Sequence, residues 1–131
     1  MDIPQDTILV VDDEATVLNF CKLILTRSGF AVVEARNGEE ALRQVPPSGS
    51  PIRLALIDVV MPGMNGFELA KQIRRRAPRM EILLMSGYSV SEVKNIAGGD
   101  HPYRVMWKPF KADSLVRMIQ TVLDNVPRHD T

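Results

Sequence analysis

The chain has almost no cysteine and no excess of charge of either sign. Its 131 residues include one cysteine, Cys21, which excludes an internal disulfide and a metal cage built from thiolates. Cys21 falls on the apolar face of an expected helix, where we interpret it as a buried, unreactive thiol. Sixteen basic and sixteen acidic side chains give a formal net charge of zero. That balance provides no electrostatic reason to expect binding to nucleic acid or to a membrane surface.

Long apolar runs are also missing. None approaches the roughly 20 residues that cross a bilayer, and residues 1–4 lack the basic and apolar regions of a signal peptide. The composition, 45% hydrophobic and 24% charged, is that of an ordinary globular domain. We therefore expect one cytoplasmic domain over residues 1–131, with a core at about 6–126, short tails and no contact with a membrane.

Short apolar runs alternate with segments of helical periodicity along the whole chain. The apolar runs predict buried parallel strands at 7–11, 30–35, 54–57, 81–85 and 105–107. Apolar residues at helical spacing predict helices at 14–28, 38–45, 66–77, 89–97 and 113–126, and the pattern is weakest at 89–97. This alternation predicts a doubly wound α/β fold. Five strands favour the order 2-1-3-4-5, with the first and third strands adjacent.

Reactive side chains lie at the ends of four predicted strands. Asp12 and Asp13 end the first strand, Asp58 the third, Ser86 the fourth and Lys108 the fifth. Because the carboxyl ends of parallel strands form the ligand-binding edge of an open sheet, we expect these side chains to converge. Each alone is typical of a turn or a helix cap, but their joint occurrence at four strand ends favours a site.

Three convergent carboxylates repel one another unless a cation neutralises them. Oxygen ligands without a nearby histidine or cysteine favour a hard ion such as Mg²⁺. We predict Asp13 and Asp58 as direct ligands and Asp12 as a ligand through water. The backbone carbonyl of Val60 completes the predicted set.

The same residues suit the transfer of a phosphoryl group. Asp58, the central residue of the cluster, is our candidate nucleophile, because a carboxylate can form an aspartyl phosphate. The metal ion would offset charge on the incoming group and help to align the attack. The Lys108 ammonium would bind one phosphoryl oxygen, and the Ser86 hydroxyl would donate a hydrogen bond to another.

Taken in order, these motifs resemble the CheY-like receiver domains of two-component response regulators, over essentially the whole chain. The matching segments are 8–14, 56–58, 61–66, 83–88 and 108–110. The resemblance implies a flavodoxin-like (βα)5 three-layer sandwich. It also implies that Asp58 accepts a phosphoryl group from a histidine kinase or a histidine phosphotransfer domain, with Mg²⁺ or Mn²⁺. A cis peptide bond between Lys108 and Pro109 is a further implication.

In such domains phosphorylation changes the surface around the fourth helix, the fifth strand and the fifth helix, and a partner reads the change. The resemblance therefore implies a phosphorelay switch that promotes only its own phosphotransfer and dephosphorylation, not a metabolic enzyme. The partner is an output protein or a fused kinase, and the same surface is a candidate homodimer interface. No contact of this domain with nucleic acid is expected.

In the family, residues beside the expected site control the response to phosphorylation and the hydrolysis of the aspartyl phosphate. Val105 stands where the family carries an aromatic residue that turns inward on phosphorylation. Tyr103 and Trp107 lie nearby and share its face only if the strand is regular; we interpret Trp107 as an ordinary packing residue. Val60 and Tyr88 occupy positions that modulate hydrolysis of the aspartyl phosphate in the family. Both are bulky, so we predict a long-lived phosphoryl group.

Two further segments carry expectations of their own. Residues 97–102 hold two glycines and a proline, which predicts that the helix at 89–97 is short or mobile. His101 in this segment is expected to be exposed, without a phosphorelay role. The basic cluster at 74–76 and Arg79 is expected to be a solvated helix end that complements the helix dipole.

A phosphohydrolase and a phosphorylation-independent interaction module are the alternative functions. A phosphohydrolase with an aspartate nucleophile usually carries a second aspartate two residues further on, where this chain has Val60. A phosphorylation-independent, receiver-like interaction module stays open because of Val105, although the intact acidic residues, Ser86 and Lys108 argue against it. We expect no output domain after the last helix. Both a stand-alone regulator and a piece of a hybrid kinase fit the pattern.

Overall fold

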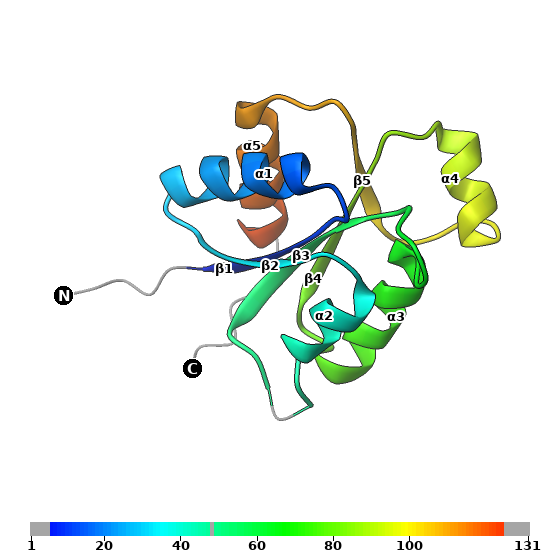
Figure 1. Cartoon of the computed structure of the whole chain (residues 1–131), viewed down its shortest axis with the longest axis horizontal. Coiled ribbons are helices and arrows are strands. Elements are labelled where there is room, and N and C mark those ends of the chain that lie inside the picture. The colour runs from blue at the N-terminus through cyan, green and yellow to red at the C-terminus, as the bar shows by residue number, and fades with distance from the viewer. Residues whose placement is uncertain (1–5, 48, 125–131) are drawn as a thin grey trace.

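Five parallel strands form the central sheet of the computed structural model, which describes residues 6–47 and 49–124 (Figure 1). The strands are β1 (Thr7–Val11), β2 (Ala31–Ala35), β3 (Ile52–Asp58), β4 (Glu81–Ser86) and β5 (Arg104–Trp107). Their order is β2-β1-β3-β4-β5, and every neighbouring pair is parallel. The predicted strand order is therefore confirmed, and β1 lies beside β3.

Helices cover both faces of this sheet. They are α1 (Ala15–Arg27), α2 (Gly38–Arg43), α3 (Gly66–Arg76), α4 (Val90–Ala97) and α5 (Ala112–Asp124). Helices α1 and α5 lie on one face, α2 and α3 lie on the other, and α4 stands out at the β5 end of the sheet (Figure 1). This is the predicted flavodoxin-like, three-layer arrangement. Within the described residues, no helix is long and apolar enough to cross a membrane.

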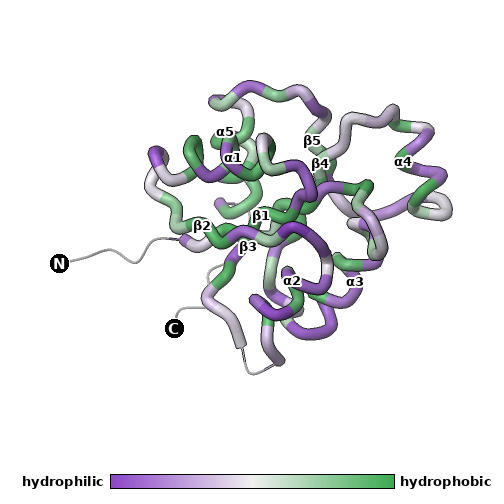
Figure 2. The backbone as a smooth tube through the Cα atoms, in the orientation of Figure 1, coloured by the Kyte–Doolittle hydropathy of each residue, from purple (hydrophilic) through white to green (hydrophobic). Residues whose placement is uncertain are grey.

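Two apolar clusters fill the layers on either side of the sheet. Because side chains alternate along each strand, Leu9 and Ile57 pack with the α2 and α3 side, while Ile8 and Leu56 pack with the α1 and α5 side. Figure 2 shows apolar residues along the strands and hydrophilic residues along much of α2 and α3. Burial of both faces fixes the register of the strands, and the register fixes where their carboxyl ends lie.

Local sequence signals set the helix ends. Asn65 begins α3 and Ser89 begins α4, each through a capping box with the glutamate three residues further on. Gly29 follows α1 with φ 96°, and Gly98 ends α4 with φ 80°, a left-handed backbone that favours glycine. The predicted helix stop at Gly29 is confirmed. The predicted end of the last helix at Val126 lies outside the described residues.

The region around α4 differs in part from the sequence expectation. The helix is short, as predicted, and Val93 is its one buried residue; its mobility stays a prediction. The expectation that His101 is exposed is wrong, because its ring is half-buried with its centroid 4.9 Å from that of Phe67. Nδ1 of His101 accepts the backbone N–H of Tyr103 at 3.2 Å. The segment between α4 and β5 folds back against α3, a tertiary contact that local periodicity does not reveal.

The basic end of α3 is solvated only in part. Arg76 donates to the carbonyl oxygens of Leu42 at 2.9 Å and Val45 at 3.3 Å. These carbonyls lie at the end of α2, where a helix leaves backbone acceptors without partners, so Arg76 ties α3 to α2. Arg75 and Arg79 are exposed, as expected. The contact of Arg76 with α2 could not be predicted from the sequence of α3 alone.

Candidate functional site

The carboxyl ends of β1 and β3 bring three acidic side chains together. One oxygen atom from each of Asp12, Asp13 and Asp58 lies within 4.8 Å of the other two. Asp12 and Asp58 are only 0% and 6% exposed, whereas Asp13 is exposed. The register places Val11 opposite Ile57, so the residues that follow these two lie side by side. The convergence expected from the strand order is therefore present.

Lys108, directly after β5, reaches into the acidic cluster. Its Nζ lies 2.9 Å from Asp12 Oδ2, 3.4 Å from Asp58 Oδ1 and 3.9 Å from Glu14 Oε1. The peptide bond between Lys108 and Pro109 is cis, as the family resemblance implied. Sequence analysis missed the contact with Glu14, although a third acidic residue next to the predicted acidic pair was a signal for it.

Burial and neighbouring charges shift the pKa values at the site. Burial raises the pKa of Asp58 from 3.8 to about 6, the charge of Asp12 adds to the rise, and Lys108 opposes it. Burial acts to lower the pKa of Lys108, but its hydrogen bond to Asp12 and the charges of Asp58 and Asp12 outweigh burial, so that pKa is raised. One ammonium thus faces several carboxylates. A set of oxygen ligands with excess negative charge suits a hard divalent cation.

Ser86 ends β4 and is buried. Its Oγ accepts the backbone N–H of Tyr88 at 2.9 Å, and its carbonyl oxygen accepts the backbone N–H of Lys108 at 2.7 Å. The register of β3 on β4 pairs Asp58 with Met85, so Ser86 is the next residue beyond the neighbour of Asp58. The hydroxyl keeps its own hydrogen, which remains available to a further acceptor.

Gly66 lets α3 approach the backbone of Asp58 closely. A Cβ atom at Gly66 would lie 2.6 Å from the carbonyl oxygen of Asp58 and 3.0 Å from Cα of Val59. The backbone N–H of Gly66 donates to the carbonyl oxygen of Val59 at 2.8 Å. Any side chain here would displace the segment that carries Asp58. The sequence places Gly66 at a helix start and in the family motif at 61–66, but no local pattern shows that two backbones meet there.

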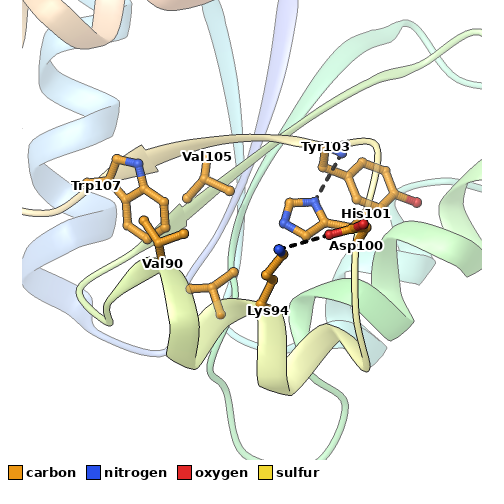
Figure 3. A pocket seen from close by; sticks show the side chains of 8 residues that line it. Val90, Lys94, Asp100, His101, Tyr103, Val105 and Trp107 are labelled. Carbon is orange, nitrogen blue, oxygen red and sulfur yellow. Dashed lines mark hydrogen bonds and ion pairs between the residues drawn. The ribbon is translucent and has the colours of Figure 1, made fainter.

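The residues beside the site lie at different depths. Val60 is half-buried and Tyr88 is 46% exposed. Tyr103, Val105 and Trp107 line one pocket, so β5 is regular and the three side chains share a face (Figure 3). Trp107 is 41% exposed, so its interpretation as an ordinary packing residue is wrong.

Cys21 lies apart from this chemistry. Its side chain is fully buried in the layer between the sheet and the helices α1 and α5. Burial, with a smaller contribution from Asp12, raises the pKa of the thiol to about 12. A thiol that does not ionise is a poor nucleophile and a poor metal ligand, as the sequence analysis expected.

Comparison with known proteins agrees with this geometry. Residues 8–120 match the family model of the response regulator receiver domain. The transcriptional regulatory protein ResD of Bacillus subtilis is 34% identical over 125 residues, which cover 94% of this chain and 50% of ResD. The sensor kinase CckA of Brucella abortus is 30% identical over 118 residues, which cover 90% of this chain and 12% of CckA. The chain therefore spans half or less of the length of these relatives.

Solved structures show the same fold. The response regulator TrrA from Thermotoga maritima, in complex with Mg²⁺-BeF, superposes with a TM-score of 0.74 and 32% identity. The match covers 90% of this chain and 99% of TrrA. Four observations agree on one family: the family model, the relatives, the strand order and the acidic cluster. The chain belongs to the receiver domains of two-component response regulators, and its acidic pocket fits the phosphoacceptor site of that family.

Proposed function

We propose that Asp58 accepts a phosphoryl group from the phosphohistidine of a histidine kinase or a histidine phosphotransfer domain. The observation that carries this proposal is the position of its carboxylate. It is 6% exposed, clusters within 4.8 Å of Asp12 and Asp13, and lies 3.4 Å from the ammonium of Lys108. A nucleophile among like charges can receive an anionic phosphoryl group once further positive charge is bound.

The acidic cluster would supply that charge by holding Mg²⁺ or Mn²⁺. Asp13 and Asp58 would bind the ion directly, Asp12 would bind it through water, and the carbonyl of Val60 would complete the protein ligands. Bound there, the ion neutralises the carboxylates and the phosphoryl oxygens. The oxygen-only donor set supports this assignment, as does the relative TrrA, which was solved in complex with Mg²⁺-BeF.

Asp58 would attack the phosphoryl group, and Lys108 and Ser86 would bind its oxygens. A carboxylate oxygen of Asp58 attacks phosphorus in line, and the P–N bond to the donor imidazole breaks as the new O–P bond forms. The electron pair of the broken bond returns to the imidazole nitrogen. Lys108 then pairs with a phosphoryl oxygen in place of the Asp58 carboxylate, and the Ser86 hydroxyl donates its hydrogen to another.

The resulting acyl phosphate would be long-lived. Val60 is half-buried and apolar, and Tyr88 is a large side chain two residues after Ser86, so we expect both to obstruct the water molecule that would attack phosphorus. The domain would therefore act as a phosphoacceptor switch that promotes only its own phosphotransfer and dephosphorylation. We propose no separate substrate on which it acts as an enzyme.

The proposed partners follow from this role. The phosphoryl donor would be a histidine kinase or a histidine phosphotransfer domain. Downstream, the surface formed by α4, β5 and α5 would be read by an output protein or by a fused kinase, and it is also our candidate homodimer interface. ResD, a transcriptional regulatory protein, and CckA, a sensor kinase, support these two contexts respectively. We place the domain in the cytoplasm, without contacts of its own to nucleic acid or membrane.

Intact mass measurement tests the proposal. The protein is incubated with acetyl phosphate and Mg²⁺, and the mass of one phosphoryl group is expected to appear. It should be absent without the metal and in Asp58→Asn. The matched variant Asp124→Asn removes an exposed carboxylate far from the site in the chain and should still gain the phosphoryl group. A gain in Asp58→Asn equal to that of the wild type would contradict the assignment.

The phosphorylation-independent interaction module is not favoured. Burying the charged groups of Asp12, Asp58 and Lys108 costs desolvation free energy. An interaction module that is never phosphorylated would gain nothing from such a buried cluster. That alternative predicts no phosphoryl gain from acetyl phosphate and none from a phosphorylated histidine kinase. Testing both donors separates it from a receiver that reacts only with its own kinase.

A further inference from the structure

Glu14 begins α1, but its carboxylate does not cap the helix. Side chains that cap a helix accept an N–H group of its first turn, and the carboxylate of Glu14 makes no such bond. The N–H of Glu14 donates to Asp12 Oδ1 at 2.9 Å, and its carbonyl oxygen accepts the N–H groups of Val17 at 3.1 Å and Leu18 at 3.2 Å. The backbone is thus fixed beside the acidic cluster, and the carboxylate is available for another contact.

That contact is with Lys108. Among the described residues, three carboxylates form ion pairs with its Nζ: Asp12 at 2.9 Å, Asp58 at 3.4 Å and Glu14 at 3.9 Å. An ammonium carries three N–H donors, so one can face each carboxylate. The pair with Glu14 is the longest, and the side chain of Glu14 is 61% exposed, so this pair is the weakest of the three in the metal-free protein.

A divalent cation in the acidic cluster would change this order. Asp12 and Asp58 belong to the proposed ligand set, so the cation would neutralise their charge and repel the ammonium beside them. Among these ion-pair partners of Lys108, Glu14 lies outside the ligand set, and its carboxylate would keep its full attraction. The stem of a lysine is long and flexible. Without Glu14, the ammonium would therefore be free to turn away from the site into water.

We propose that Glu14 is a positioning residue, which keeps the ammonium of Lys108 directed at the incoming phosphoryl group while the acidic cluster holds a divalent cation. This inference rests on the proposed phosphoacceptor function. Glu14 does not itself contact the phosphoryl group and acts only through Lys108. If the charge of Glu14 merely repelled an anionic donor, its removal would speed phosphorylation. The proposal predicts the opposite, because an ammonium that is not held in place binds the phosphoryl oxygens less often.

Acylation of lysine side chains, followed by peptide mass mapping, reports the position of the ammonium independently of phosphorylation. The variant Glu14→Gln removes the charge and loses no capping bond. At saturating Mg²⁺, Lys108 of this variant should react severalfold faster with an N-hydroxysuccinimide ester than Lys108 of the wild type. Without metal the two should react at similar rates, since Asp12 and Asp58 hold the ammonium in both. The exposed Lys71, on α3, is the internal standard. Equal rates in Mg²⁺ would overturn the proposal.

Phosphorylation by acetyl phosphate at saturating Mg²⁺, followed by intact mass, gives a second readout. The maximal rate constant of Glu14→Gln should fall roughly two- to fivefold, the range of a partly exposed ion pair, while the half-saturating donor concentration stays unchanged. The side chain in Glu14→Asp is one methylene, roughly 1.5 Å, shorter. This variant keeps the charge without the contact and should be slowed equally. The matched variant Glu39→Gln breaks an exposed pair with Arg43 and should behave as the wild type does.

The outcomes separate this inference from the proposed function. If the wild type gains the phosphoryl group but Glu14→Gln is phosphorylated as fast or faster, the inference fails and the proposed function stands. A wild-type rate in Glu14→Asp would also overturn the inference, because charge without contact would then suffice. If the wild type gains no phosphoryl group from any donor, both fall.

Discussion

The ammonium of Lys108 lies 3.4 Å from Asp58 Oδ1, although one residue follows β5 and the other ends β3. The same ammonium is closer to Asp12, at 2.9 Å. Lys108 is thus shared between two buried carboxylates and neutralises neither fully, and Asp13 adds a third negative charge. The site keeps an unbalanced negative charge, which a divalent cation and then a phosphoryl group would resolve.

The stability of the metal-free protein should depend on pH through Asp58. The pKa of Asp58 in the folded protein, about 6, lies above its ordinary value of 3.8, so the folded state binds this proton more tightly than the unfolded state. The stability that Asp58 contributes is therefore present below pH 3.8 and is lost as pH rises toward 6. Across this window the loss amounts to at most about 3 kcal/mol.

Asp58→Asn removes this titration. In metal-free buffer the free energy of unfolding of the variant should exceed that of the wild type near neutral pH, and the difference should shrink as pH falls from 6 toward 4. Urea unfolding across this range measures the difference. Asp124→Asn, with the same change of charge at an exposed residue, should show no such trend. A constant gap between the Asp58→Asn and wild-type curves would refute the burial argument.

Sequence reasoning predicted the parts of this account that depend on local pattern. Alternating apolar runs predict the strand order, and the strand order brings Asp12, Asp13 and Asp58 to one edge. Contacts between distant segments were not predictable in this way. The burial of His101 against Phe67 and the approach of Gly66 to Asp58 depend on how α3 meets its neighbours. The sequence around His101 or Gly66 contains no local pattern that predicts these contacts.

Gly66→Ala should damage the site without touching a charged residue. Its Cβ would lie 2.6 Å from the carbonyl oxygen of Asp58, so the backbone at Asp58 must move. We expect a loss of about 1–3 kcal/mol in stability and a phosphorylation rate lower by on the order of 10–100-fold. Gly87→Ala is the matched control, because its nearest new contact, Cβ of Lys108, is at an ordinary 4.0 Å. Equal rates for the two variants would show that close backbone approach is unimportant.

Val60→Asn should shorten the life of the phosphoryl group. A polar amide beside phosphorus can orient an attacking water molecule, which the half-buried isopropyl group of Val60 cannot do. Loss of the phosphoryl mass after removal of the donor should be several-fold faster in the variant. Decay at the wild-type rate would mean that Val60 does not limit the access of water.

Amide exchange should be faster in α4 than in α5. Val93 is the one buried residue of α4, whereas α5 buries Leu115, Ile119, Val122 and Leu123. Few buried apolar contacts lower the free energy of local opening. Hydrogen exchange followed by mass spectrometry measures both helices in one experiment. Protection of α4 equal to that of α5 would rule out mobility as part of its function.

The most direct test locates the phosphoryl group on the chain. After phosphorylation with Mg²⁺, borohydride reduces an acyl phosphate to an alcohol, so a phosphorylated aspartate becomes homoserine, which peptide mass mapping identifies. The account predicts homoserine at position 58 alone, and none when Mg²⁺ is omitted. Homoserine at position 12 or 13, with Asp58 unmodified, would contradict the assignment of Asp58 as the phosphoacceptor.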